Sequence, residues 1–161
     1  MCKLYHQAEE LYEPGVHVIS TDEKTGIPAL ERLHPKRPME QGKPEALEFE
    51  YERHGTSALI ANFEVATGKV IGPSVGDTRT EEDFAAHISA VLETEPPGEW
   101  IFIGDQLNTH KSERLVRAVA KAGGIEEDLG NKGKSGILRS MASRAAFLRD
   151  ESHRIRLVYT H

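Results

Sequence analysis

The segment EWIFIGD, residues 99–105, limits the possible folds more than any other part of the sequence. Its apolar run has the length of one strand and shows no alternation with polar residues, which is typical of a strand covered on both faces. Such strands occur in sheets that carry helices on both sides. The run ends on Asp105, so a carboxylate is expected where a buried strand comes into the open.

Other segments carry strand and helix signals on either side of this run. β-branched residues at 16–21 predict a strand, and residues 57–65 and 69–72 flank a Thr67–Gly68 turn that predicts a hairpin. Three helices are predicted near residues 80–92, 111–124 and 137–150, the first from a capping box of Thr80 with Asp83 and the last from the in-phase residues Leu138, Met141, Ala145 and Leu148. A final strand is predicted within residues 153–161.

This order predicts an α/β fold with a mixed sheet, in which an antiparallel hairpin lies beside parallel strands and helices flank the sheet. Right-handed crossovers place the strand ending at Asp105 close to the strand at 16–21. Asp22 follows that first strand, so both acids are expected at the same edge of the sheet. Open α/β sheets tend to bind ligands at this edge.

Composition is consistent with one soluble domain spanning residues 1–161. Apolar residues make up 38% and charged residues 29%, and no stretch reaches the roughly 18 apolar residues of a membrane helix. Cys2 is the single cysteine and no secretory signal is evident, which fits a reducing cytoplasm. The net charge of −6 argues against non-specific DNA binding but leaves a metal-dependent nuclease core open.

Residues 27–56 are charged and rich in proline, so we expect an irregular functional segment or an ordered arm.

Two carboxylates at neighbouring strand ends repel each other unless a cation lies between them. Mg²⁺ prefers oxygen ligands and keeps positions free for water and phosphate oxygens. Two such ions about 3.5–4 Å apart can activate a water and stabilise the leaving oxygen in phosphodiester displacement. Asp22 and Asp105 are therefore the candidate ligands of a metal site.

Each candidate also has a plain structural interpretation. Asp22 is equally well explained by the turn at residues 23–26, and Asp105 could cap the helical region that follows it. His110 is a candidate ligand or phosphate contact, although an ordinary residue at a helix start is favoured. Glu23 points to the opposite face from Asp22 and is expected to be solvated.

Other types of site are disfavoured by spacing. His17, His54, His87 and His153 are far apart and lack the spacing of a zinc site, and no G-x-S-x-G elbow of a hydrolase occurs. The segment GNKGKSG lacks the spacing of a phosphate-binding loop and follows no predicted strand.

Three segments resemble the catalytic core of bacterial insertion-sequence transposases of the mariner-like superfamily. They are VHVISTDEKTGIPALERLHP, EFEYERHGTSALIANFEVATGKVIG and GDQLNTHKSE, and the resemblance covers about residues 5–160. It implies a ribonuclease H-like fold and a DDE-type triad that binds two Mg²⁺ or Mn²⁺ ions to cut transposon ends and join them to target DNA. Asp22 would be the first acid and Asp105 the second, and Asn108 and His110 would lie beside the second acid as substrate-binding residues.

The sequence departs from the family pattern in two places. The family's W-x-N-x-I-E type segment, which carries the third acid on a helix after the last strand, has no counterpart before His161. The N-terminal helix-turn-helix module is likewise not found. Glu126, Glu127 and Asp128 could be offered as substitutes for the third acid, but we expect this acidic run to be solvated.

Three functional hypotheses follow from these observations. The first is a truncated transposase core that carries two of three metal ligands and has little activity alone. The second is a non-catalytic fragment that self-associates or binds and inhibits full-length transposase. The third is an unrelated metal-dependent nuclease that completes its site with Glu23 or His110.

Overall fold

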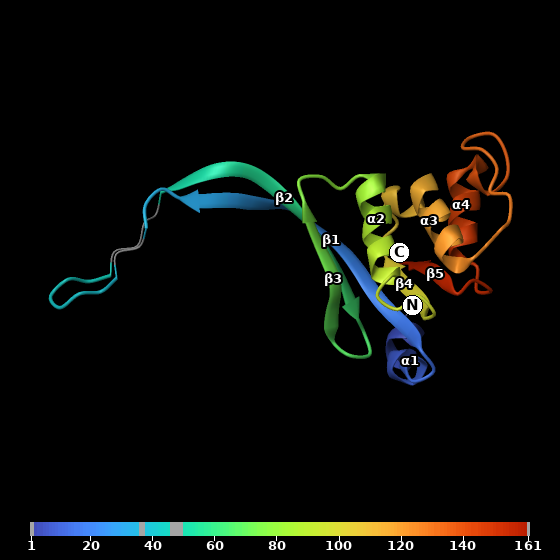
Figure 1. Cartoon of the computed structure of the whole chain (residues 1–161), viewed down its shortest axis with the longest axis horizontal. Helices are drawn as coiled ribbons and strands as arrows, with labels where there is room; N and C mark the ends of the chain where they lie inside the picture. Colours follow the sequence, from blue (N-terminus) through green and yellow to red (C-terminus); the bar gives the residue numbers. More distant parts are fainter. Residues whose placement is uncertain (1, 36–37, 46–49, 161) are drawn as a thin grey trace.

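A five-stranded mixed sheet in the order β3-β2-β1-β4-β5 forms the centre of the protein (Figure 1). The computed structural model describes residues 2–35, 38–45 and 50–160. The strands are β1 (Val16–Arg32), β2 (Tyr51–Glu64), β3 (Lys69–Gly76), β4 (Glu99–Gly104) and β5 (Ile155–Tyr159). The helices are α1 (Cys2–Tyr12), α2 (Glu81–Leu92), α3 (Glu113–Gly123) and α4 (Met141–Arg149), with 3₁₀ turns η1 (Thr109–Lys111) and η2 (Ile137–Arg139).

Strand directions confirm the predicted mixed sheet flanked by helices, which is the architecture of a ribonuclease H-like fold. β1 pairs with β4 and β4 with β5 in parallel, whereas β1–β2 and β2–β3 are antiparallel. The predicted hairpin is β2–β3, in which Gly68 adopts a positive φ of 70° at the turn. A residue with a Cβ would be strained in that conformation.

The inner strand β4, which lies between β1 and β5, has helices on both faces, as its uninterrupted apolar run predicts. Trp100 and Phe102 face the core formed with α2, α3 and α4. Ile101 and Ile103 face the opposite side, where Ala8 of α1 packs against them. Helix α1 was not predicted, although Leu4, Ala8 and Leu11 recur at helical spacing.

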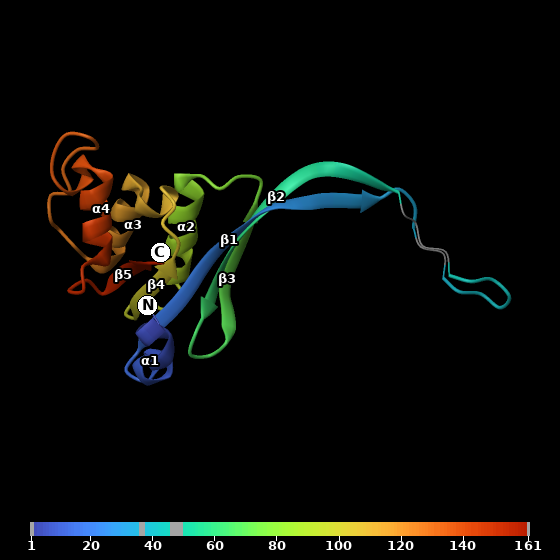
Figure 2. The same ribbon diagram turned by 180° about the vertical axis from the view of Figure 1, so that it is seen from behind.

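β1 and β2 continue beyond the sheet as a long two-stranded arm (Figures 1 and 2). The prediction that β1 ends near residue 21 in a turn at 24–26 is wrong, because pairing with β2 continues from Ile19 to Arg32. A register shift between Lys24 and Ile27 absorbs Gly26, which has a φ of +68°. The irregular segment predicted at 27–56 is thus largely an ordered arm, and its residues 36–37 and 46–49 lie outside the described residues.

Capping explains where the helices begin and end. Thr80 and Asp83 form the predicted capping box of α2, and Gly124 closes α3 in a left-handed conformation. The predicted helix at 137–150 is instead a 3₁₀ turn followed by α4, because Ser140 caps a new helix at Met141. Met141 is consequently 40% exposed rather than in the core. No helix in the described part of the chain is both long and apolar enough to cross a membrane.

Candidate functional site

Asp22 in β1 and Asp105 directly after β4 stand at corresponding positions of two neighbouring parallel strands. The last paired residues of β1 and β4 are Ser20 and Ile103, and each acid stands two residues further along its strand direction. Asp22 remains within β1, paired with Ala61 of β2, whereas Asp105 leaves the sheet directly after β4. Both residues are exposed. Their convergence on one metal ion remains a prediction.

The Asp105 carboxylate is held by a short loop. Its Oδ1 accepts a hydrogen bond from the backbone N–H of Leu107, at 3.1 Å, in an Asx-type turn. The same oxygen lies 2.8 Å from Nδ1 of His110. The helix-cap interpretation does not hold for Asp105, because Ser112 caps α3 by accepting from the backbone N–H of Leu115.

His110 is buried in η1, with 2% of its surface exposed. Its ring stacks on Phe84 of α2 at a centroid distance of 4.0 Å, and its Nε2 lies 3.2 Å from Oε1 of Glu23. The Tyr159 hydroxyl donates to the His110 carbonyl at 2.7 Å. The imidazole of His110 therefore links Glu23 to Asp105. Its burial leaves little surface for direct contact with DNA.

Glu23 belongs to this cluster of contacts although the sequence predicts a solvated side chain. Its side chain was expected to be solvated, and this is wrong, because only 4% of it is exposed. Alternation along β1 does turn it away from Asp22, but the face it reaches is the one that α2 covers. The signal was present, since Glu23 follows Ile19 and Thr21 on the same side of the strand, and both are buried.

The remaining predicted residues lie outside this cluster. Asn108 is exposed before η1 and makes no capping bond with its side chain, so its contact with substrate stays a prediction. Glu126, Glu127 and Asp128 are exposed, as expected. Within the described residues, no group of three or more His, Cys, Asp or Glu side chains has a geometry suited to a metal ion.

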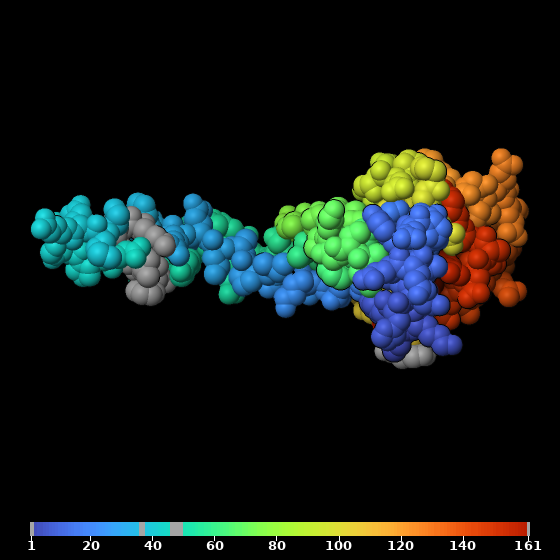
Figure 3. Space-filling model, turned by 90° about the horizontal axis from the view of Figure 1, so that it is seen from below, coloured from blue at the N-terminus to red at the C-terminus, as the bar shows by residue number. Residues whose placement is uncertain are grey.

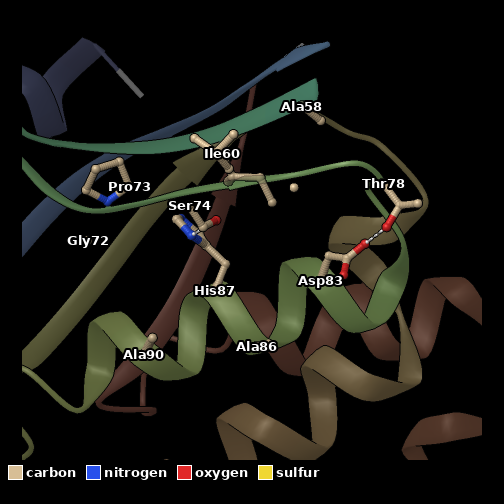
Figure 4. A pocket seen from close by; sticks show the side chains of 12 residues that line it. Ala58, Ile60, Gly72, Pro73, Ser74, Thr78, Asp83, Ala86, His87 and Ala90 are labelled. Atoms are coloured by element: carbon tan, nitrogen blue, oxygen red, sulfur yellow. Dashed lines mark hydrogen bonds between the residues drawn. The ribbon is translucent and has the colours of Figure 1, made fainter. Parts of the chain in front are cut away.

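A separate cavity of about 460 Å³ lies between β3 and α2 (Figure 4). His87 points from α2 toward Ser74, and neither Asp22 nor Asp105 lines the cavity. The Asn62 amide donates to Nε2 of His87 at 2.6 Å, which leaves Nδ1–H to donate to Ser74 Oγ at 2.8 Å. Thr21 donates in turn to Asn62 Oδ1 at 2.7 Å. This network holds a neutral imidazole in the core.

Burial lowers the pKa of His87 to about 4, so the protein should lose stability in mild acid. As pH falls below about 6.5, the unfolded chain gains a proton at this residue that the folded protein does not take up until about pH 4. The free energy of unfolding should therefore fall by about 2 kcal/mol between pH 7.5 and pH 5 on account of His87 alone.

Urea unfolding of the wild type, His87→Gln and His6→Gln at pH 7.5 and pH 5 measures this effect. Glutamine can accept from Asn62 but does not titrate, so His87→Gln should show a loss about 2 kcal/mol smaller than the wild type. The exposed His6 provides the control and should behave like the wild type. Equal pH dependence in all three proteins would contradict the prediction.

Comparisons with known proteins relate this chain to one family. Residues 17–160 match the family described as DDE superfamily endonuclease. Similar solved structures include the Mos1 mariner paired-end complex with Mn, at 17% identity and a TM-score of 0.40, covering 65% of this chain and 33% of that chain. The Mos1 paired-end complex with the left transposon end gives 16% identity and a TM-score of 0.42, covering 74% and 37%.

The chain thus spans well under half the length of these transposase chains. No curated protein matches at a significant level. The family match extends over nearly the whole sheet and over both candidate acids, from His17 in β1 to Thr160 after β5. The chain belongs to the DDE superfamily endonuclease family.

Proposed function

We propose that this chain is the catalytic core of an insertion-sequence transposase of the mariner-like superfamily, which cuts and joins DNA by metal-dependent phosphoryl transfer. Asp22 and Asp105 are the proposed ligands of Mg²⁺ or Mn²⁺. The observation that carries the proposal is their register, since each acid stands two residues beyond the last β1–β4 pair, Ser20 with Ile103.

The register supports a shared metal because neighbouring strands in a sheet lie about 4.8 Å apart. Two side chains at matched positions on such strands can approach the same ion from rigid elements. The donors are carboxylate oxygens, which suit Mg²⁺ and Mn²⁺. When bound, the ions would supply an activated water and stabilise the leaving oxygen of the phosphodiester.

The protein's own contribution is to hold these carboxylates in place. β1 holds Asp22 through its pairing with β2, and the Asx-type turn holds Asp105. Asn108 is exposed three residues after Asp105, where it could donate to a phosphate oxygen or a base of transposon-end or target DNA. The net charge of −6 supports a core whose affinity for DNA comes mostly from other segments.

Two acids are fewer than the DDE triad that the resemblance implies. Removing one carboxylate from a two-metal site weakens metal binding and misplaces the attacking water. We therefore expect residues 1–161 by themselves to bind Mn²⁺ weakly and to cut DNA slowly, as a single catalytic domain that works with further segments.

Isothermal titration calorimetry with Mn²⁺ tests the proposal. Saturable binding is expected, and Asp22→Asn and Asp105→Asn should each weaken it. Unchanged binding in both variants would refute the assignment of these two residues as ligands.

A second candidate function, association with another transposase copy, is favoured by the β1–β2 arm. The arm extends away from the body of the protein (Figure 3). The arm exposes the apolar side chains of Leu30 and Tyr51, and the segment beyond the end of β1 exposes those of Leu33 and Met39. A monomer has no need to present these side chains. Met39, for example, is 75% exposed.

Sedimentation velocity measures this association directly. The wild-type chain is expected to show a concentration-dependent dimer, and Leu30→Ser with Met39→Ser should shift it toward monomer because apolar contact area is lost. Val75→Ser, an exposed apolar residue on β3 that is 69% exposed, provides the control. A monomer at all concentrations would rule out self-association through the arm.

A further inference from the structure

Glu23, His110 and Asp105 form a continuous line of polar contacts between β1 and the loop after β4. Oε1 of Glu23 lies 3.2 Å from Nε2 of His110. Nδ1 of His110 lies 2.8 Å from the carboxylate oxygen Oδ1 of Asp105 and 3.2 Å from the backbone carbonyl oxygen of the same residue. The two acids are 82 positions apart in the sequence, and one imidazole connects them. Only Asp105 is exposed, with 51% of its side chain accessible.

The imidazole in the middle of this line is fixed in orientation. Phe84 stacks against one face of the ring at 4.0 Å and 29°. The hydroxyl of Tyr159 anchors the backbone carbonyl of the same residue. Nε2 faces the carboxylate of Glu23, and Nδ1 faces both the carboxylate and the backbone carbonyl of Asp105. Rotating the ring would therefore break contacts at both nitrogens.

Glu23 is an unusual side chain for this position. Its carboxylate is 4% exposed, and within the described residues its Oε2 is buried without a hydrogen-bond partner. The guanidinium of Arg79, 3.5 Å away, is half-exposed and provides only partial compensation. Burying a charge in this way is costly, and an apolar residue would fill the same space at lower free energy.

We propose that Glu23 and His110 are positioning residues, which together set the orientation of the Asp105 carboxylate toward the metal. The inference rests on the proposed function, because it assigns Asp105 as a ligand. Side chains that hydrogen-bond to metal ligands fix the direction of their lone pairs, and their loss commonly lowers metal affinity about 10–100-fold. Glu23 acts through the imidazole and does not contact the metal.

Two substitutions at His110 separate the two contacts. The side-chain nitrogen of asparagine can take the place of Nδ1, whereas the longer glutamine reaches the place of Nε2. His110→Gln should therefore release Asp105 and lower Mn²⁺ affinity about 10–100-fold. His110→Asn keeps a donor for Asp105 and should retain more of the affinity than His110→Gln. Glu23→Ala, which frees the ring, should also lower the affinity.

A second buried His–Glu pair provides a matched control. His17 Nδ1 lies 2.6 Å from Oε1 of Glu64, and both side chains are more than nine-tenths buried. Glu64→Ala should cost stability as Glu23→Ala does, while leaving Mn²⁺ affinity unchanged. A merely structural role for Glu23 would give the same Mn²⁺ affinity in both alanine variants.

The carboxyl ¹³C chemical shift of Asp105 in metal-free protein is the second readout. Glu23→Gln keeps the size of the side chain, so it is expected to fold and to change this shift through His110. An unchanged Asp105 shift, or wild-type Mn²⁺ affinity in His110→Gln and Glu23→Ala, would overturn the positioning role. If Asp105→Asn itself leaves Mn²⁺ binding intact, the proposed metal site fails first, and the positioning role fails with it.

Discussion

Asp105→Asn is expected to lower metal-dependent DNA cutting by about 100-fold or more. Asparagine keeps an oxygen that can accept from the backbone N–H of Leu107, so the loop after β4 should keep its conformation. The substitution removes the negative charge that offsets a divalent cation. The expected loss is therefore one of metal binding and transition-state stabilisation, with the fold intact.

Nicking of supercoiled plasmid and cleavage of transposon-end duplexes, each with Mg²⁺ or Mn²⁺, measure this loss. Asp128→Asn is the matched control, because Asp128 is exposed and its Oδ1 accepts from the backbone N–H of Gly130 in the same kind of turn. It changes the net charge by the same amount, so it should cut DNA like the wild type. Cutting that persists in Asp105→Asn would show that the activity does not depend on this carboxylate.

Trp100→Ala is expected to lower the free energy of unfolding by about 3–5 kcal/mol. Trp100 is the second residue of β4 and has 1% of its surface exposed, and it stacks on His17 at a centroid distance of 4.2 Å. Phe102 lies 6.0 Å further along the same face. Truncation leaves a cavity between the sheet and the helices, which the surrounding side chains can close only partly.

Trp100→Phe separates the cost of the cavity that Trp100→Ala leaves from the effect of removing the indole N–H. Phenylalanine keeps an aromatic ring against His17 and removes the indole N–H, which is buried without a hydrogen-bond partner within the described residues. We expect this variant to lose less than half as much stability as Trp100→Ala in urea unfolding at pH 7.5. Similar losses in the two variants would show that the cavity does not dominate the cost.

Much of the sheet could be predicted from local patterns. The apolar run at residues 99–104, the Thr67–Gly68 turn and the Thr80 capping box correspond to β4, the β2–β3 hairpin and the start of α2. These signals are local, since they depend on strand or helix periodicity and on one or two turn residues. Asp105 was recognised for the same reason, because the end of a buried strand is visible in the sequence.

The arm and helix α1 could not be predicted in the same way. Residues 22–32 contain few apolar residues, and they form a strand because β2 supplies hydrogen-bonding partners as far as Tyr51. Helix α1 is stabilised by packing against Ile101 and Ile103, which are about 90 residues distant in the chain. Both depend on contacts between segments that lie far apart in sequence.

The sequence by itself determined the α/β class, the order of the strands and of helices α2 to α4, and the two exposed acids, of which Asp22 lies in β1 and Asp105 follows β4. Only the tertiary structure decided that Glu23 is buried and that His110 joins it to Asp105. The reason is physical: strand alternation assigns a side chain to one of two faces, but which face the helices cover depends on how the whole chain packs. A carboxylate that looks solvated in the sequence can therefore become a buried partner of the proposed metal site.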